Sequence, residues 1–388
     1  MRTLIAYCVM NHTAFAGGRV ALSLSGLELK ASAFSIGLML SFISLLPMFL
    51  SVPGGRLIDR VGMLPPLLGG AALLALGVAA PFIGWDLGAL FFSAVANGVG
   101  FMAFHIAMQK AAGELGEAGR PPDDARRRTN FSLLALGFSV SGFLGPTMAG
   151  FLIDGVGHRM TFGLLALLPA VSIVGLLRWP FAARLPERAS TKAVPDGSAR
   201  ITDLLREPEL RRLYVAVALL SSAWDVHQFL VPLYGASLGL SASLIGLVLG
   251  AFSAATFIVR MVLPWLSRHV SEWPLILSAL GTAAVVYALY PFFPVLPAMF
   301  ALSFVLGLGL GCAQPMVLSV LHKASPPGRV GEAVGLRVTL ISATQTFLPT
   351  LFGALGGLLG LGALFWGMAL LVGAGTGYTW TRRGETGR

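Results

Sequence analysis

The residues best suited to chemistry in this sequence are a few ionisable groups set inside long apolar stretches. Asp225 lies near the middle of one such stretch, and no other of the 17 acidic residues lies so far inside an apolar run. Ser221, Asp225 and Gln228 are spaced to share one face of a helix, whereas His227 points elsewhere. Trp224, beside the acid, either stacks on a substrate or packs in the core. A lone buried carboxyl group of this kind is suited to taking up and releasing a proton.

Basic residues form the second set of candidates, because Arg19, Arg260 and Arg337 also fall within apolar stretches. Burial favours the neutral form of a carboxyl group, and a nearby cation favours its ionised form. We therefore expect Asp225 to face Arg19 as a pair that protonation breaks, which would couple proton movement to substrate movement. Three arginines and His12 against one acid favour an anionic or zwitterionic solute over a lipophilic cation. Arg260 and Arg337 lie nearer helix ends, where they either gate the pathway or extend to the membrane surface.

Motifs that would indicate other chemistry are missing from the sequence. No P-loop, HExxH or GxSxG sequence occurs, so we expect no enzyme activity, no cofactor and no metal site. The glycines Gly307, Gly309 and Gly311 lie in an apolar stretch with no preceding strand, which indicates close helix packing and not nucleotide binding. Cys8 and Cys312 both lie in apolar runs and cannot build a disulfide framework.

The composition identifies the chain as a membrane protein. Of its 388 residues 56% are hydrophobic and 11% are charged, against about 25% charged residues in soluble domains. Mean hydropathy is +0.80. A helix that crosses a bilayer core needs about 20 mostly apolar residues. The sequence supplies twelve such stretches, at about residues 4–25, 35–53, 64–84, 88–109, 130–152, 160–180, 212–234, 243–265, 273–293, 296–319, 333–354 and 362–381.

The positions of the basic residues predict the orientation of these helices. With the N-terminus in the cytoplasm, Lys30 and Arg159 are the basic residues expected on the outer side, and the rest of those outside the spans are cytoplasmic. This distribution follows the positive-inside rule, so both termini are expected in the cytoplasm. The net charge of +10 then reflects the orientation of the helices in the membrane and not binding to nucleic acid. We therefore expect a lipid bilayer and no nucleic acid as partner. The expected location is the bacterial cytoplasmic (inner) membrane, with multiple spans.

The two halves of the sequence resemble one another. The shift that aligns residues 35–38 (SIGL) with residues 244–247 (LIGL) also aligns Gly98 with Gly307. Repeats of six helices each have the same orientation, and such repeats place a substrate site at their interface near the membrane midplane.

Two pseudo-symmetric six-helix bundles are therefore expected. They comprise residues 1–181 and 212–388, and the polar segment 182–211 is the expected cytoplasmic linker. The same shift that relates the halves places His12 and Arg19 of the first predicted helix opposite Ser221 and Gln228 of the seventh.

A loop between the second and third predicted helices resembles the signature loop of the major facilitator superfamily. Residues 55–62 (GRLIDRVG) match its pattern G-x-L-x-D-R-x-G, although the final basic pair of that pattern is missing. Gly55 and Gly62 permit tight turns. Asp59, next to Arg60, can accept hydrogen bonds from a neighbouring helix N-terminus in one conformation and lose them in another. The resemblance extends over essentially the whole chain and implies a twelve-helix transporter fold.

Further residues in the spans bear on what is transported and how. Gly145 and Pro146, within residues 137–150, resemble the glycine-proline motif of antiporters in that superfamily, and helix packing without antiport is the alternative. Ala94 stands where the superfamily's drug-antiporter pattern carries arginine, which argues against a drug-proton antiporter of the usual kind. The repeat also relates His105 to Gln314, and the resemblance implies that the first, fourth, seventh and tenth helices line a central cavity.

The sequence thus predicts an all-α membrane protein that acts as a secondary active transporter for a small organic solute by alternating access. Proton-coupled efflux is favoured, and proton-coupled uptake by symport is the alternative. A non-transporting membrane receptor and a membrane-embedded enzyme are remote alternatives. Expected partners are the small-molecule substrate and protons as the coupling ion, and we expect a monomer.

Overall fold

All twelve predicted spans are long α-helices in the computed structural model, which describes residues 2–114, 124–178, 204–326 and 330–381. The described residues contain no strand, which confirms the predicted all-helical membrane fold. The helices are α1 (Arg2–Glu28), α2 (Ala33–Val61), α3 (Leu64–Ile83), α4 (Leu87–Glu114), α5 (Asp124–Val156), α6 (His158–Arg178), α8 (Pro208–Ser237), α9 (Ala242–His269), α10 (Glu272–Leu289), the short 3₁₀-helix η2 (Tyr290–Phe292), α11 (Leu296–Ala324), α12 (Val330–Leu359) and α13 (Leu361–Thr381).

Among the described helices, eleven are long and apolar enough to cross a membrane by length and composition. The twelfth, α1, has 27 residues and would extend about 40 Å, which exceeds the thickness of a bilayer core. α1 is more polar than the other spans, and a membrane helix can carry such residues where they lie inside the bundle. Asn11, for example, is fully buried and donates a hydrogen bond of 2.7 Å to the Ser172 hydroxyl of α6. We therefore treat α1 as a membrane span.

Close helix contacts recur at matching places in the two halves of the chain. A Cβ atom added to Gly98 of α4 would lie 1.9 Å from the Ile43 carbonyl oxygen of α2. A Cβ atom added to Gly307 of α11 would lie 2.2 Å from the Phe252 carbonyl oxygen of α9. Both glycines are therefore required for backbone-to-backbone packing, and the sequence repeat corresponds to a repeat in three dimensions.

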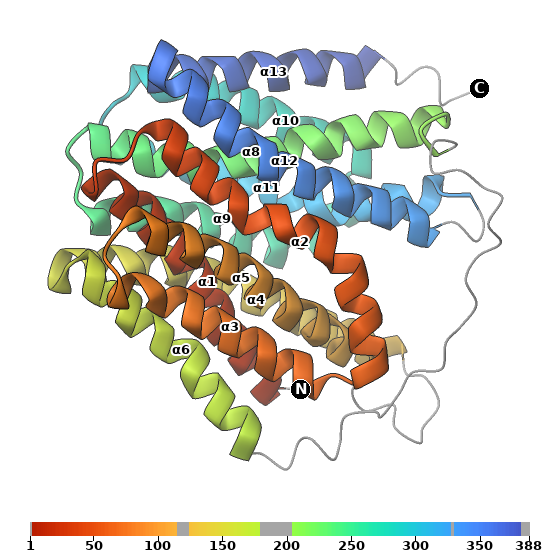
Figure 1. Cartoon of the computed structure of the whole chain (residues 1–388). Helices are drawn as coiled ribbons and strands as arrows, with labels where there is room; N and C mark the ends of the chain where they lie inside the picture. The colour runs from red at the N-terminus through yellow and green to blue at the C-terminus, as the bar shows by residue number, and fades with distance from the viewer. Residues whose placement is uncertain (1, 115–123, 179–203, 327–329, 382–388) are drawn as a thin grey trace.

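Two helix pairs join the first-half helices (α1–α6) to the second-half helices (α8–α13). α2 packs along α12 and α5 packs along α9, and we call these pairs the α2–α12 seam and the α5–α9 seam (Figure 1). A Cβ atom on Gly37 would lie 2.1 Å from the Pro349 carbonyl oxygen, and one on Gly246 would lie 2.4 Å from the Pro146 carbonyl oxygen. The backbones of the two halves thus touch at both seams.

These seam contacts gather at one end of the bundle. α1 begins at Arg2 and α13 ends at Thr381 on the same side of the bundle (Figure 1). We call this side the termini end and the opposite side the far end. Gly37 and Gly246 lie near the far-end starts of α2 and α9. Toward the termini end α2 and α12 move apart (Figure 1). The two halves are therefore held together mainly at the far end.

Gly37→Ala is expected to destabilise the protein, because the added methyl group has no space beside the Pro349 carbonyl. Overpacking of this kind costs about 1–3 kcal/mol, so the melting temperature of the purified protein should fall. Gly69→Ala in α3 is the matched control, since a Cβ atom there meets nothing within 4 Å. Equal melting temperatures for the two variants, measured by intrinsic fluorescence, would contradict a tight α2–α12 seam.

Candidate functional site

A cavity of about 220 Å³ lies between two first-half helices, α1 and α5, and two second-half helices, α8 and α9. Each of the four helices contributes both apolar and polar groups to its walls. The lining residues are His12, Phe15, Ala16, Arg19, Phe138, Ser139, Gly142, Pro146, Trp224, Gln228, Ser253, Thr256 and Arg260. The position between the halves is where repeats of this kind place a solute site.

The charged groups on the cavity wall are cationic. Arg19 enters from α1 and Arg260 from α9, and no Asp or Glu is among the lining residues. The Arg260 guanidinium donates a hydrogen bond of 2.9 Å to the Ser139 hydroxyl of α5, across the α5–α9 seam. Arg19 makes no hydrogen bond to another described residue. Since a guanidinium presents five donors in a planar fork, Arg19 can still receive a carboxylate or a similar anion.

Asp225 lies behind the cavity wall, between α8 and α12. Its side chain is 2% exposed, and one carboxylate oxygen accepts hydrogen bonds of 3.3 Å from the Ser221 and Thr344 hydroxyls. The other oxygen accepts no hydrogen bond of good geometry from the described residues, although the Gln345 side chain lies close to the carboxylate. Asp225 and Arg19 interact electrostatically, yet they form no direct ion pair within the described chain. The expected pair is therefore a longer-range one.

His12 lines the cavity beside the arginines. Its Nδ1 atom and the Ser141 hydroxyl of α5 are hydrogen-bonded at 2.5 Å. The imidazole packs edge-on against the Phe138 ring, with centroids 4.9 Å apart, and stacks near Phe15 at 6.0 Å. These contacts fix the ring against α5, so His12 combines a packing role with a place on the cavity wall.

Like Asp225 and Ser221, the predicted site residues His105 and Gln314 do not line the main cavity. His105 of α4 packs behind the Phe138 ring, with centroids 4.9 Å apart, and is hydrogen-bonded to Gln109. Gln314 of α11 lies in a separate pocket of about 10 Å³, whose wall includes Trp224. The cavity wall is thus formed by α5 and α9, which meet at a seam, and not by the fourth and tenth helices as expected.

The neighbours of Asp225 in α8 divide between the cavity and the core. Trp224 and Gln228 line the main cavity, and the Trp224 ring packs edge-on against Phe252 at 4.6 Å. His227 is fully buried away from it, where its Nε2 atom is hydrogen-bonded to the Ser303 hydroxyl at 3.0 Å. His227 thus points away from the cavity, as its spacing indicates, but Ser221 and Asp225 do not join Gln228 on the cavity wall.

Arg260 and Arg337 both point into the bundle. Arg260 lines the main cavity, and Arg337 donates a hydrogen bond to the Gln314 side chain in the small pocket. The alternative that these arginines extend to the membrane surface is therefore not what the structure shows. One donor nitrogen of each guanidinium is hydrogen-bonded to a neutral side chain, Ser139 or Gln314, which does not neutralise its charge.

The glycine-proline segment of α5 holds three helices together. A Cβ atom on Gly145 would lie 2.8 Å from the Ala16 Cβ atom of α1, and the Pro146 carbonyl contacts α9 beside Gly246. Pro146 also lines the cavity. The segment thus connects the cavity wall to the α5–α9 seam, and it performs the packing role given above as the alternative to antiport.

The signature loop lies at the termini end of α2. Gly62 ends that helix with φ +84°, a conformation that favours glycine, and its N–H donates to the Ile58 carbonyl at 3.0 Å. Gly55 has open space around it, and Arg60 is exposed. The Asp59 side chain lies outside the described part of the structure, as does most of the expected linker 182–211. The gating role of this loop stays a prediction.

Several lining residues escaped the sequence reasoning. Phe15, Phe138, Ser139, Ser253 and Thr256 all line the cavity. The two serines carry the clearest signal, because each is a polar residue in an apolar span near a helix-packing glycine. Ser253 donates a hydrogen bond of 2.9 Å to the Gly142 carbonyl oxygen across the α5–α9 seam. A search for polar residues beside small residues in the predicted spans would have found both.

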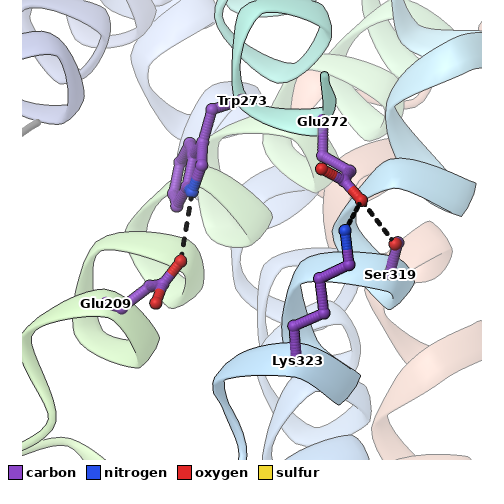
Figure 2. Close-up of polar contacts among 5 residues, drawn as sticks. All are labelled: Glu209, Glu272, Trp273, Ser319 and Lys323. Carbon is purple, nitrogen blue, oxygen red and sulfur yellow. Dashed lines mark hydrogen bonds and ion pairs between the residues drawn. The ribbon is translucent and has the colours of Figure 1, made fainter. Parts of the chain in front are cut away.

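A second polar cluster lies far from the cavity, at the termini end of the second-half helices. Glu272 of α10 contacts Lys323 and Ser319 of α11, and Trp273 donates a hydrogen bond to Glu209 of α8 (Figure 2). The acid lies in the first turn of α10 and the lysine in the last turn of α11, where each complements its helix dipole. This cluster stabilises helix ends and belongs to no cavity described above.

Replacing Arg19 and Asp225 together is expected to cost less stability than the sum of the single changes. Arg19→Met leaves a buried acid without its cation, and Asp225→Asn leaves the cation without its acid, so each charge loses its counterpart. A coupling of about 0.5–3 kcal/mol is expected from chemical unfolding of the two single variants and the double variant. Arg260→Met combined with Asp225→Asn is the control and should be additive. Additivity for both pairs would contradict the Arg19–Asp225 interaction.

Comparisons with known proteins agree with this architecture. The chain is 27% identical over 325 residues to the multidrug efflux pump Tap of Mycolicibacterium fortuitum, covering 80% of this chain and 76% of that protein. Its fold is similar to that of a POT family transporter in complex with a thioalcohol-conjugated peptide (TM-score 0.83, 14% identity, 100% of this chain and 96% of the other). It is also similar to the nucleoside transporter NupG (TM-score 0.80, 12% identity, 98% and 99% covered). The sequence model of the Major Facilitator Superfamily matches residues 5–300. The chain therefore belongs to the major facilitator superfamily and is a multi-pass membrane transport protein, not an enzyme.

Proposed function

We propose that this protein carries small organic anions or zwitterions out across a bacterial cytoplasmic membrane by alternating access, in exchange for protons. The observation that carries the proposal is the cavity between α1, α5, α8 and α9, in which Arg19 and Arg260 stand without a lining carboxylate. Proton-coupled uptake by symport is the second candidate. It is favoured by Ala94, which replaces the arginine of the drug-antiporter pattern.

The charge of the cavity supports an anionic group on the solute. Arginine at bilayer depth costs about 2.5–3.5 kcal/mol on insertion scales, so it is retained where it has a partner or a wet cavity. Arg19 has an open cavity and no hydrogen-bond partner in the described chain, and Arg260 has one neutral partner, Ser139. A carboxylate or a similar anion would satisfy both guanidinium groups. A lipophilic cation would meet two like charges.

The size and the remaining walls of the cavity support a small solute with an apolar part. At about 220 Å³ the cavity is smaller than the pockets of about 300–1,000 Å³ that hold drug-sized ligands. Phe15, Phe138 and Trp224 supply aromatic surface beside the arginines. The efflux relative at 27% identity supports the direction of transport, while this cavity supports a narrower range of solutes than a multidrug pump would take.

Alternating access requires the two halves to move about this cavity. We propose that residues 1–181 and 212–388 move as two bundles, with 182–211 as the linker and both termini in the cytoplasm. The seam contacts near Gly37 and Gly246 gather at the far end, and α2 and α12 separate toward the termini end (Figure 1). In this orientation the described conformation has its outer side closed. The protein is proposed to act as a monomer, because its cavity is formed within one chain.

Asp225 is the proposed proton carrier. It is buried behind the cavity wall, and its second carboxylate oxygen accepts no hydrogen bond of good geometry from the described residues, so this oxygen has a position for a proton. Protonation of Asp225 would remove the attraction between its carboxylate and Arg19, and an incoming anion would compete with the carboxylate for Arg19. Proton and solute thus act on one residue, Arg19, from two sides. This arrangement serves efflux and uptake equally, so the direction needs a transport measurement.

Binding of a small carboxylate is expected to raise the melting temperature of the purified protein. A ligand that binds only the folded form stabilises it by about 2.7 kcal/mol at a concentration 100 times its Kd. Benzoate, phenylalanine and tetraphenylphosphonium probe an anion, a zwitterion and a lipophilic cation. Arg19→Gln should lose the response, and Arg159→Gln should keep it, because Arg159 lies outside the cavity and caps the Phe82 and Ile83 carbonyls. Stabilisation by tetraphenylphosphonium alone would contradict an anion site.

Asp225→Asn is expected to abolish transport driven by a pH gradient in proteoliposomes while leaving solute exchange at equal pH intact. The amide keeps the shape of the carboxylate and cannot take up a proton in the same range. His227→Gln, two residues away in α8 and outside the cavity, is the control and should remain coupled. The transported probe is the carboxylate that gives the largest thermal shift. Wild-type coupling in Asp225→Asn would remove Asp225 from the mechanism.

A further inference from the structure

Asp154, near the far end of α5, contacts the first residues of α9 in the other half of the chain. Its two carboxylate oxygens accept hydrogen bonds from the backbone N–H groups of Ala242 at 3.1 Å and Ser243 at 2.8 Å. The side chain itself is exposed. This bidentate contact crosses the α5–α9 seam and uses none of the residues of the cavity.

The contact completes the N-terminus of α9. The first N–H groups of a helix have no partner inside the helix, and a negative charge there is favoured by the helix dipole. Ser241 caps α9 from within its own half, since its hydroxyl accepts from the Leu244 N–H at 3.4 Å and its carbonyl accepts from the Ile245 N–H at 3.1 Å. Asp154 accepts from the N–H groups of Ala242 and Ser243, which lie between Ser241 and Leu244 in the sequence. α9 therefore depends on α5 for half of this cap.

The equivalent position in the other seam carries no carboxylate. The repeat that relates Pro146 to Pro349 and Gly150 to Gly353 places Gly357 of α12 where α5 has Asp154. Backbone packing is the same at both places. A Cβ atom on Gly150 would lie 2.3 Å from the Ala242 carbonyl oxygen, and one on Gly353 would lie 2.5 Å from the Ala33 carbonyl oxygen. The α5–α9 seam thus has the same packing plus a charged cap. The α2–α12 seam has packing and neutral side-chain hydrogen bonds, such as that between the Ser41 and Thr350 hydroxyls at 2.8 Å, but no carboxylate at this position.

We propose that Asp154 is a positioning residue of the transport cycle, which fastens α9 to α5 and holds the far end of the bundle closed. Opening the far end separates the two helices and removes both hydrogen bonds together. The inference rests on the proposed movement of the two halves, and it does not depend on which solute is carried. Because Gly357 provides no counterpart, the charged part of the closure at the far end falls on the α5–α9 seam alone.

The strength of the contact suits a reversible closure. The carboxylate is exposed and borders a cleft of about 410 Å³ that also contains Glu28, Lys30 and His158. An exposed carboxylate at a helix N-terminus contributes modestly, and more in partly buried bidentate geometry. Water can replace both hydrogen bonds when the helices separate. The closed form is therefore favoured without being locked.

Distances between spin labels across the far end test the proposal without a substrate. Labels are attached at Ile83→Cys and Val295→Cys, which are exposed on opposite halves, in a Cys8→Ala and Cys312→Ala background in nanodiscs. Asp154→Asn is expected to raise the ratio of long to short distances by about threefold to thirtyfold. Asp86→Asn is the control, because Asp86 caps the Ala89 N–H of α4 within one half. It should leave the ratio unchanged.

A ratio in Asp154→Asn equal to that of wild type, or an equal rise in Asp86→Asn, would overturn the proposal. A second variant adds a carboxylate to the other seam and leaves Asp154 in place. A Cβ atom on Gly357 meets nothing within 4 Å, so there is open space for the new side chain, and Gly357 lies one helical turn beyond Gly353, which contacts the Ala33 carbonyl at the start of α2. Gly357→Asp should therefore lower the ratio of open to closed distances. A ratio at or above that of wild type would also overturn the proposal. Failure of the anion or proton proposals would leave both of these results unaffected.

Discussion

The structure depends on keeping the Arg19 cation inside an apolar bundle with a single acid, Asp225, near enough to balance it. A charge at bilayer depth is retained only where a partner or a wet cavity compensates its lost hydration. Here the guanidinium opens onto a cavity, and the carboxylate is held behind the wall by the Ser221 and Thr344 hydroxyls. Neither group is fully satisfied by protein atoms of the described chain. Arg19 can therefore accept an anion from the cavity, and Asp225 can accept a proton.

The internal repeat determines how the helices pack, and the positions at which the two halves differ carry the charged groups. Both seams bring backbones into contact through matching glycines, so the two halves meet in similar ways at the far end. The charged groups do not match. α1 provides His12 and Arg19 where α8 provides Ser221 and Gln228, and α5 provides Asp154 where α12 has Gly357. A symmetric frame permits two related conformations, and in the proposed mechanism the asymmetric charges let protons and solute favour one of them.

The sequence was sufficient for the twelve helices, because the apolar length needed to cross a bilayer is a strong constraint. It also placed Arg19 in the cavity and separated His227 from it, since buried charge and helical spacing are local properties. His105, Gln314, Asp225 and Ser221 were also expected on the cavity wall, and none of them is among its lining residues. Whether a side chain faces a cavity depends on the rotation of its helix against neighbours distant in sequence, and contacts such as that of Gly246 with Pro146 fix this rotation. Such contacts could not be read from one sequence.

The most direct test of the central claim is to locate a bound anion. A crystal structure with 4-bromobenzoate, in which the bromine is identified by its anomalous scattering, would show where a carboxylate binds. The account predicts one bromine site in the cavity walled by α1, α5, α8 and α9, with the carboxylate against Arg19 and Arg260, and no such site in Arg19→Gln. A bromine site elsewhere in the bundle, or an unchanged site in Arg19→Gln, would contradict it.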